Sequence, residues 1–397
     1  MSDPSKTEYE GVITAPVPSY RWRNIFFFAG THLTALIGVP IYLHFHTVPL
    51  DTFLLSAFYF IATGMAVTVG YHRLFSHRTF SANKLVEFLV LFFGAASFEE
   101  SALCWSSQHR AHHQYTDTDL DPYNIKKGFF YAHMGWMMFW KFPKEYPNVK
   151  DLKQNALLMH QAKHFIPWSI GAGIVLPALI GAMFGHFWEA GLFAVAARIT
   201  LVYQGTFCIN SFCHMFGRAT YDINSTAKDN WVNALFTWGE GYHNFHHRFP
   251  NDYRNGIRWF HWDPSKWAIR FFEMIGFAYN LKRTSPFTII NARLAAENSR
   301  AVLHLAKIEK RKEQVAHIRE VVNKKYEQVT SLLQEWEIQL KNHRALLQNN
   351  FQRSSERFTD SLDDLKNARA RFFEARREWL KLVDRHIYVR FPLTVGI

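Results

Sequence analysis

The sequence predicts an all-α integral membrane protein with four transmembrane helices, a cytosolic helical cap and a C-terminal region of long helices. Three observations support this prediction. Four apolar stretches each supply about 20 residues, enough to cross a hydrocarbon core of about 30 Å. The pattern His-x-x-His-His occurs twice, as HRAHH (109–113) and HNFHH (243–247). Residues 287–391 contain neither Gly nor Pro and carry an apolar stripe at helical spacing.

The four predicted spans contain a single Lys, Arg, Asp or Glu, which is Arg198. They cover residues 24–46, 52–72, 165–187 and 190–212. The short links inside each pair of spans carry no Lys or Arg, whereas the long segments on the other side are rich in both. Because basic loops stay in the cytosol, both termini and the central loop should be cytosolic. Residues 1–20 are polar with several prolines, so we expect a polar tail there rather than a cleavable signal peptide.

A fifth apolar stretch, residues 85–105, contains Glu87, Glu99 and Glu100. A carboxylate at membrane depth costs roughly 2.5–3.5 kcal/mol on insertion scales. We therefore expect a re-entrant or interfacial segment rather than a fifth span. With four spans, all histidine motifs fall on the cytosolic side of the membrane.

The histidine motifs predict a di-metal site. Histidine makes up 21 of 397 residues, so two copies of a three-histidine pattern are improbable by chance. Positions i, i+3 and i+4 share one face of a helix. Nine imidazoles exceed the tetrahedral shell of one zinc and suit two ions, although nitrogen ligands alone leave iron and zinc both open. The candidate ligands are His72, His77, His109, His112, His113, His214, His243, His246 and His247, with Asn210 one helical turn before His214.

Composition excludes several other protein classes. Three cysteines form no CxxC pair, so neither a disulfide framework nor a zinc ribbon is expected. The net charge of +12 suits anionic lipid headgroups or an acidic protein carrier, and we expect no nucleic-acid partner.

The order of the motifs resembles the membrane-bound fatty acyl desaturases, specifically the Δ9 or stearoyl-CoA desaturase-like branch, with a bacterial type of member expected. The resemblance covers about residues 20–282. It rests on WRNI, GYHRLFSHRTF, HRAHHQYTDTDLDPYN, NSFCHMFG, GEGYHNFHHRFPNDYRNG and WDPSKW, which occur in this order. His243 stands where the front-end desaturases carry Gln.

This resemblance implies two iron ions, held by the nine histidines and by Asn210 through water. The irons would activate O2 with two electrons from a small donor of ferredoxin or cytochrome b5 type. Two hydrogens would leave adjacent methylenes of a saturated acyl chain, giving a cis double bond. Asp117 and Asp121 are candidates to accept the second N–H of ligand imidazoles. The expected location is a bacterial inner membrane rather than the endoplasmic reticulum.

The same resemblance implies substrate-binding residues. Trp105 and Thr206 match positions at the bend of the acyl tunnel, and Glu99 stands where the family usually has Gln. Arg23 and Asn24 match positions that contact coenzyme A in animal members. The Arg-Asp pair before the second histidine motif is replaced by Ser and Gln at 107–108, which leaves acyl-CoA, acyl carrier protein and phospholipid open as carriers.

Two other functions remain open at this point. A lipid hydroxylase or oxidase would use the same metal cluster. A histidine-rich metal transporter or sensor is the alternative from another class, but transporters keep polar ligands along a midplane pathway, whereas here the motifs lie at or beyond the ends of the spans.

The predicted domains are a tail (1–20), a membrane domain (21–285) and a C-terminal helical region (286–391). In the last region an apolar stripe from Val315 to Leu347 predicts one or two long helices in a coiled coil or bundle. Self-association through this stripe, or docking of the electron donor, are the roles expected for it.

Overall fold

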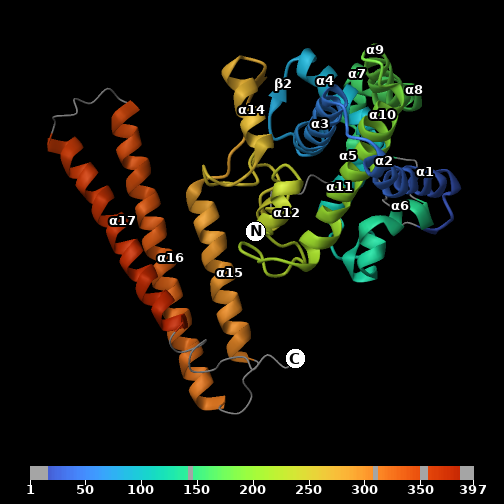
Figure 1. The fold of residues 1–397 in the computed structure, drawn as a ribbon. Helices are drawn as coiled ribbons and strands as arrows, with labels where there is room; N and C mark the ends of the chain where they lie inside the picture. Colours follow the sequence, from blue (N-terminus) through green and yellow to red (C-terminus); the bar gives the residue numbers. More distant parts are fainter. Residues whose placement is uncertain (1–16, 142–145, 307–311, 349–355, 385–397) are drawn as a thin grey trace. The chain divides into compact units, whose positions relative to one another are not determined.

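The computed structural model describes residues 17–141, 146–306, 312–348 and 356–384. The chain divides into two compact units. One comprises Met1–Ala219 with Ser225–Arg283, and the other Thr220–Asn224 with Thr284–Ile397. The described residues are mostly helical (Figure 1), which confirms the predicted fold class.

Four helical stretches of the first unit are long and apolar enough to cross a membrane, which confirms the predicted number of spans. They are Trp22–Phe45, Leu50–Ser76, Phe165–Met183 and Phe187–Met215. Each is assembled from consecutive helical segments. These segments are α1 (Trp22–Leu33), η1 (Thr34–Gly38) and α2 (Val39–Phe45); α3 (Leu50–Met65) and η2 (Ala66–Ser76); α8 (Phe165–Ile170), η7 (Gly171–Val175) and α9 (Leu176–Met183); α10 (Phe187–Ala190), η8 (Gly191–Ala197) and α11 (Arg198–Met215).

The second span differs from an ordinary α-helix at its C-terminal end. There η2 is a π-helix of 11 residues, all buried, and it includes His72. A π-helix is uncommon and is frequently found at functional sites, and the other three spans contain shorter π-helical segments in η1, η7 and η8. The span thus extends four residues beyond the predicted boundary at residue 72 and carries the start of the first histidine motif inside the protein.

The fifth apolar stretch forms two helices, and it is not among the candidate spans of the described residues. The helix α4 (Lys84–Ala96) begins at Asn83, whose side chain accepts from the Val86 amide. The helix α5 (Ala102–Tyr115) begins at Ser101, whose hydroxyl accepts from the Cys104 amide. The break contains Glu99 and Glu100, which argued against a span but were not taken as the point where the stretch divides into two helices.

Side chains of α11 hold this break in position. Arg198 is buried and donates to the carbonyl oxygens of Ala96 and Gly173. The Tyr203 hydroxyl donates to the Phe98 carbonyl at 2.6 Å. The Ala96 carbonyl lies at the C-terminus of α4, where carbonyls carry partial negative charge, and the Gly173 carbonyl of η7 is a second acceptor for the one charge that lies inside a predicted span.

Short elements complete the first unit and join segments far apart in sequence. Antiparallel pairs place Val17 opposite Lys141 and Ser81 opposite Tyr279. The short elements are β1 (Val17–Pro18), β2 (Ser81–Ala82), η3 (Ile125–Lys127), η4 (Tyr131–Gly135), α6 (Trp136–Phe139), β3 (Trp140–Lys141), η5 (Pro147–Val149), η6 (Leu152–Gln154), α7 (Ala156–Lys163), α12 (Trp231–Phe236), α13 (His243–Arg248), α14 (Pro264–Met274) and β4 (Ala278–Tyr279).

The described residues of the second unit form three long helices, whereas the sequence predicted one or two. They are α15 (Pro286–Ala306), α16 (Lys312–Gln348) and α17 (Glu356–Val383), drawn in orange to red in Figure 1. Val322, Val329 and Leu333 of the predicted stripe pack against apolar residues of the other two helices, including Leu294 and Trp379. Burial of this part of the stripe therefore requires no second copy of the chain. Self-association of the chain stays a prediction, but the need to bury this stripe no longer supports it.

We predict that both ends of the broken fifth stretch lie on one side of the membrane. Lys84 begins α4 and Lys126 follows α5, and both side chains are exposed. Single cysteines at these positions should react with a membrane-impermeant thiol reagent from the same face of sealed vesicles. Thr47→Cys, in the link between the first two spans, is the control for the other face. Labelling of Lys84→Cys and Lys126→Cys from opposite faces would show that the stretch crosses the bilayer.

Candidate metal centre

The structure brings all nine predicted histidines into two adjacent clusters. One cluster contains His72, His77, His109, His113 and His246, and the other contains His112, His214, His243 and His247. Within each cluster the candidate ligand nitrogens all lie within 4.8 Å of one another. Such convergence of nitrogen donors from four segments is the arrangement that a metal ion requires.

Helical spacing explains how each motif contributes to the site. The second motif lies on α5 and the third on α13, so each presents three imidazoles on one face. Each triplet is nevertheless divided between the two clusters. His109 and His113 join the first cluster, while His112, displaced around the helix, joins the second. In the third motif His246 joins the first cluster, whereas His243 and His247 join the second.

The Nε2 atoms approach each other closely. In the first cluster, His72 and His246 are 3.0 Å apart, and His77 and His109 are 2.8 Å apart. In the second, the Nε2 atoms of His214 and His243 are 3.0 Å apart. Two nitrogens that bind one ion at about 2.1 Å lie at most about 4 Å apart, and these pairs satisfy that limit.

Carboxylates fix the tautomer of two of these rings, one in each cluster, so that Nε2 is unprotonated. His72 donates through Nδ1–H to Glu240 Oε2 at 2.9 Å. His112 donates through Nδ1–H to Asp121 Oδ1 at 2.8 Å. Since an ionised carboxylate only accepts, the proton of each neutral ring lies on Nδ1 and the Nε2 lone pair faces the cluster. Opposed lone pairs at about 3 Å repel one another, so a cation between them is the species that this arrangement fits.

Asp117 acts one step further away than the sequence suggested. His214 Nδ1 lies 2.7 Å from the Thr226 hydroxyl, which donates in turn to Asp117 Oδ1 at 2.6 Å. Asp117 Oδ2 also accepts from the Thr226 amide at 2.9 Å. Of the two predicted aspartates, Asp121 thus contacts an imidazole directly, whereas Asp117 reaches one through Thr226.

Sequence reasoning missed Glu240, which lies three residues before the third histidine motif. Its Oε1 accepts from Arg73 at 2.9 Å, and Arg73 also bonds Asp263 at 3.0 Å. Burial alone would raise the pKa of Glu240, but His72 and Arg73 outweigh it and hold that pKa below its ordinary value. The sequence GEGYHNFHH places this carboxylate close to the third histidine motif, and that proximity could have identified it as a partner of a ligand imidazole. Tyr123, whose hydroxyl lies 3.2 Å from His109 Nδ1, had no such signal.

Burial keeps the cluster imidazoles neutral. It lowers the pKa of His109, His113, His243 and His246 well below the ordinary value, and the neighbouring histidines lower it further. Neutral imidazole is the form that binds metal ions. The site is therefore ready to bind cations at neutral pH without first releasing protons from these rings.

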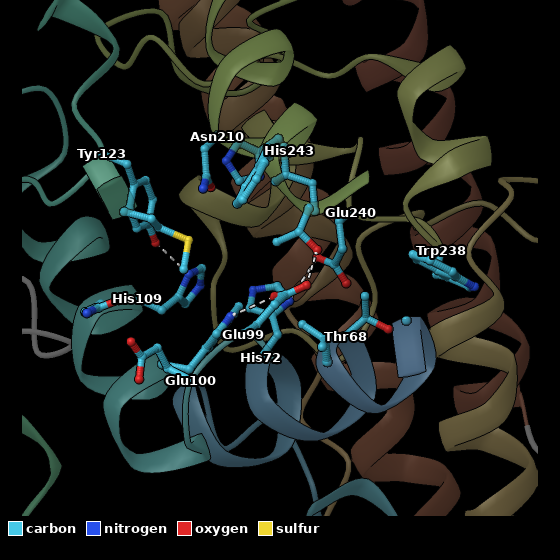
Figure 2. Close-up of a pocket in the computed structure, with 18 of the residues that line it drawn as sticks. Thr68, His72, Glu99, Glu100, His109, Tyr123, Asn210, Trp238, Glu240 and His243 are labelled. Atoms are coloured by element: carbon cyan, nitrogen blue, oxygen red, sulfur yellow. Dashed lines mark hydrogen bonds and ion pairs between the residues drawn. The ribbon is translucent and has the colours of Figure 1, made fainter. Parts of the chain in front are cut away.

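A largely apolar cavity adjoins the clusters. Its wall includes His72, His109 and His243, and Asn210 also lines it, close to His243 in Figure 2. The remaining wall is mostly apolar or aromatic. It includes Gly64, Val67, Trp105, Trp136, Met137, Phe207, Ile209 and Trp238. A cavity of this kind holds an apolar chain beside the metal centre.

Three of the predicted substrate residues meet in this wall. Glu99 Oε1 accepts from the Thr206 hydroxyl at 2.7 Å, and Oε2 accepts from Trp105 Nε1 at 3.3 Å. The Trp105 ring stacks on His109 with centroids 4.8 Å apart. Glu99 is buried, and burial raises its pKa to about 7. A carboxyl group that titrates near neutrality thus lies between the cavity and the indole that covers a candidate ligand.

The structure places the other two predicted substrate residues outside the cavity lining. Arg23 is exposed on α1, and Asn24 donates to the Met137 carbonyl at 3.0 Å. The neighbouring Arg21 forms a 3.1 Å ion pair with Glu100, which does line the cavity. Gln108 also lines it, whereas the Ser107 hydroxyl is bonded to Asn148.

Comparison with known proteins agrees with this geometry. Residues 52–279 match the model of the family described as fatty acid desaturase. The chain is 41% identical over 265 residues to a probable acyl-CoA desaturase of Schizosaccharomyces pombe, covering 66% of this chain and 54% of that protein. It is 41% identical over 262 residues to acyl-CoA desaturase 1 of Saccharomyces cerevisiae, covering 65% and 51%. The chain thus spans about half the length of these two relatives.

A mammalian relative is covered more fully. The chain is 33% identical over 296 residues to the stearoyl-CoA desaturase of Homo sapiens, covering 72% of this chain and 81% of that protein. These three relatives are eukaryotic, and the expectation of a bacterial type stays a prediction. The family match covers the end of the second span with His72 and His77, the end of the fourth with His214, and the helices α5 and α13, and so it includes all nine histidines of both clusters. The chain therefore belongs to the fatty acid desaturase family.

Proposed function

We propose that the chain is a membrane-bound acyl desaturase that places a cis double bond at the Δ9 position of a saturated acyl chain, using two irons, O2 and two electrons. The observation that carries the proposal is the position of the two histidine clusters. His72 and His109 of the first and His243 of the second lie in the wall of a largely apolar cavity. An acyl chain in this cavity would pass directly beside the metal centre.

Iron is proposed on chemical grounds. An all-nitrogen ligand set does not by itself select iron over zinc. Removal of hydrogen from an unactivated methylene is an oxidation, and zinc has no redox chemistry. When bound, two irons would supply the oxidising power of O2, which with two electrons and two protons takes two hydrogens from adjacent methylenes and leaves two waters.

The residues of the chain supply orientation and exclusion of water. A methylene is selected over its neighbours only if the acyl chain is held in a fixed position, since all methylenes are chemically alike. The hydrogen bonds from Trp105 and Thr206 to Glu99 give that part of the wall a fixed shape. The Trp105 ring stacks on the His109 ring, and so it lies between that candidate metal ligand and the adjoining part of the cavity wall.

The proposed carrier is coenzyme A, because the two yeast relatives are named acyl-CoA desaturases. One end of the cavity is lined by Glu100 and Gln108, and Glu100 pairs with the partly exposed Arg21. These polar groups suit the thioester end of a substrate. The electron donor of ferredoxin or cytochrome b5 type and the cellular membrane remain proposals taken from the resemblance.

We predict that the chain makes a cis monoene in a host that lacks unsaturated fatty acids. The Δ9 isomer is expected because the motifs match that branch of the family. Gas chromatography and mass spectrometry of derivatised fatty acids would identify both the product and the bond position. A hydroxy acid as the main product would contradict the proposal and support the lipid hydroxylase that the same cluster would serve.

We predict that the purified protein binds about two irons per chain. Replacement of one ligand in each cluster, by His112→Ala and His246→Ala, should remove iron and lower turnover by at least about 100-fold, because even changes in the hydrogen-bond partners of metal ligands cost about 10–100-fold. Iron analysis and membrane fractionation would be measured together. The exposed His164, outside both clusters, provides the matched control in His164→Ala. Unchanged iron and turnover in either ligand variant would remove that residue from the site.

We predict that Glu99 makes substrate binding sensitive to pH. Its pKa is raised to about 7, so the group is neutral below that pH and charged above it. An apolar chain that covers Glu99 disfavours the charged form, so binding takes up a proton and KM should rise above about pH 7, by at most about tenfold per pH unit. Glu99→Gln keeps the shape of the side chain and abolishes the titration, and its amide oxygen can accept from Trp105 Nε1 while its amide nitrogen donates to the Thr206 hydroxyl oxygen.

The measurement is KM of both proteins between about pH 6 and about pH 8.5. The KM of the wild type divided by the KM of Glu99→Gln should rise with pH. A ratio that does not vary with pH would show that Glu99 does not titrate in contact with the substrate.

A further inference from the structure

An indole ring lines the cavity between the second and fourth spans. Trp238 lines the cavity and is 9% exposed. A Cβ atom added to Gly64 of the second span would fall 2.2 Å from its ring. A Cβ atom added to Gly205 of the fourth span would lie 3.8 Å from Trp238 Cζ3. The ring thus occupies space that the side chain of a larger residue at 64 would otherwise fill.

Several contacts fix the position of this ring. Phe60, one turn before Gly64, packs against it with ring centroids 5.1 Å apart. The Ser265 hydroxyl lies 3.0 Å from the Trp238 carbonyl and 2.7 Å from the Thr68 hydroxyl. Trp238 also adopts a φ of +51°, which is unfavourable for a residue with a side chain. A backbone strained in this way and held by hydrogen bonds gives the indole one defined position.

The opposite end of the cavity is polar and reaches solvent. Glu100 and Gln108 line it, and the side chains of Glu100 and Arg21 are 23% and 24% exposed. Figure 2 shows Glu100 and Trp238 on opposite sides of His72. The carrier end of a substrate therefore lies towards Glu100, and the methyl end points towards Trp238.

We propose that Trp238 sets the upper limit on the length of the acyl chain by closing the methyl end of the cavity. The inference rests on the proposed desaturase function. The position of the double bond is counted from the carboxyl end, which lies at the other end of the cavity. Shortening the side chain at 238 should therefore admit longer chains and leave the bond at the same carbon. Selection against a chain that is one methylene too long amounts to about 10–200-fold in such a pocket.

The first test uses Trp238→Val and Trp238→Phe in isolated membranes. The substrate is an equimolar mixture of palmitoyl-, stearoyl- and arachidoyl-CoA, with O2 and an electron donor supplied. The ratio of arachidoyl to palmitoyl product should rise by at least about tenfold in Trp238→Val and by less in Trp238→Phe. The double bond should stay at the position found in the wild type.

A second test refills the space from the opposite wall. Gly64→Leu alone should clash with the indole ring, because even a Cβ atom falls 2.2 Å from it. Combined with Trp238→Val, the same leucine enters the vacated volume and should restore the wild-type length preference. A change of preference that the second substitution reverses is specific to cavity length, whereas general damage to the site would not be reversed.

The control and the contradicting outcomes are defined by the same measurements. Trp259, 86% exposed and outside the cavity lining, gives the matched control Trp259→Val, which should leave the product ratio unchanged. Product ratios in Trp238→Val and Trp238→Phe within about twofold of the wild type, with iron content retained, would overturn the inference. A double bond displaced at constant chain length would overturn it as well, because Trp238 would then set register and not length. Absence of any monoene from the wild type refutes the proposed function itself.

Discussion

The structure depends on hydrogen bonds from imidazole Nδ1 atoms to acceptors outside the clusters. Glu240 holds His72, Asp121 holds His112, and the Thr226 hydroxyl, itself held by an aspartate, lies against His214. Each interaction turns an Nε2 lone pair inward and so creates electrostatic repulsion at the centre of each cluster. A bound cation relieves that repulsion, and without these acceptors the rings would be free to rotate and to pair with one another. The affinity of the site is therefore determined as much by the acceptors as by the ligands.

Buried acceptors require compensation of their own. Glu240 and Asp263 are fully enclosed, and both contact the buried guanidinium of Arg73, the residue that follows His72 in sequence. An unpaired buried charge is strongly destabilising, whereas a charge network with all its hydrogen bonds made is tolerated. One residue of the second span thus provides a ligand and the next provides the cation that keeps the acceptor of that ligand ionised. The π-helical turn of η2 allows both side chains to face the protein interior.

The sequence predicted the parts of this architecture that depend on local spacing. Spans follow from the lengths of apolar stretches, and the two histidine triplets follow from positions that share a helix face, whereas His72, His77 and His214 were assigned from the resemblance to the desaturase family. The division of each triplet between two clusters could not be predicted, because it depends on the relative orientation of α5 and α13. The break after Ala96 and the contacts of Thr226 and Tyr123 depend likewise on residues distant in sequence. The third C-terminal helix lies in a segment where the apolar stripe had not been followed, so its pairing with α16 was also missed.

The residues that hold the cavity wall in place differ from those that orient the imidazoles of the metal centre. Residues that determine selectivity are therefore distinct from residues that serve the chemistry. Imidazole orientation relies on carboxylates and a hydroxyl, whereas the hydrogen bonds of Glu99 go to Thr206 and Trp105, and Trp238 is held through packing and its backbone carbonyl. A change in these wall residues would alter the space and charge inside the cavity without removing an acceptor from an imidazole. Hydrogen abstraction requires a fixed arrangement of ligands, but chain length and carrier require only that the wall fit one chain. A family with this division of roles can change its substrate by substitutions in the wall while it keeps the same histidine motifs.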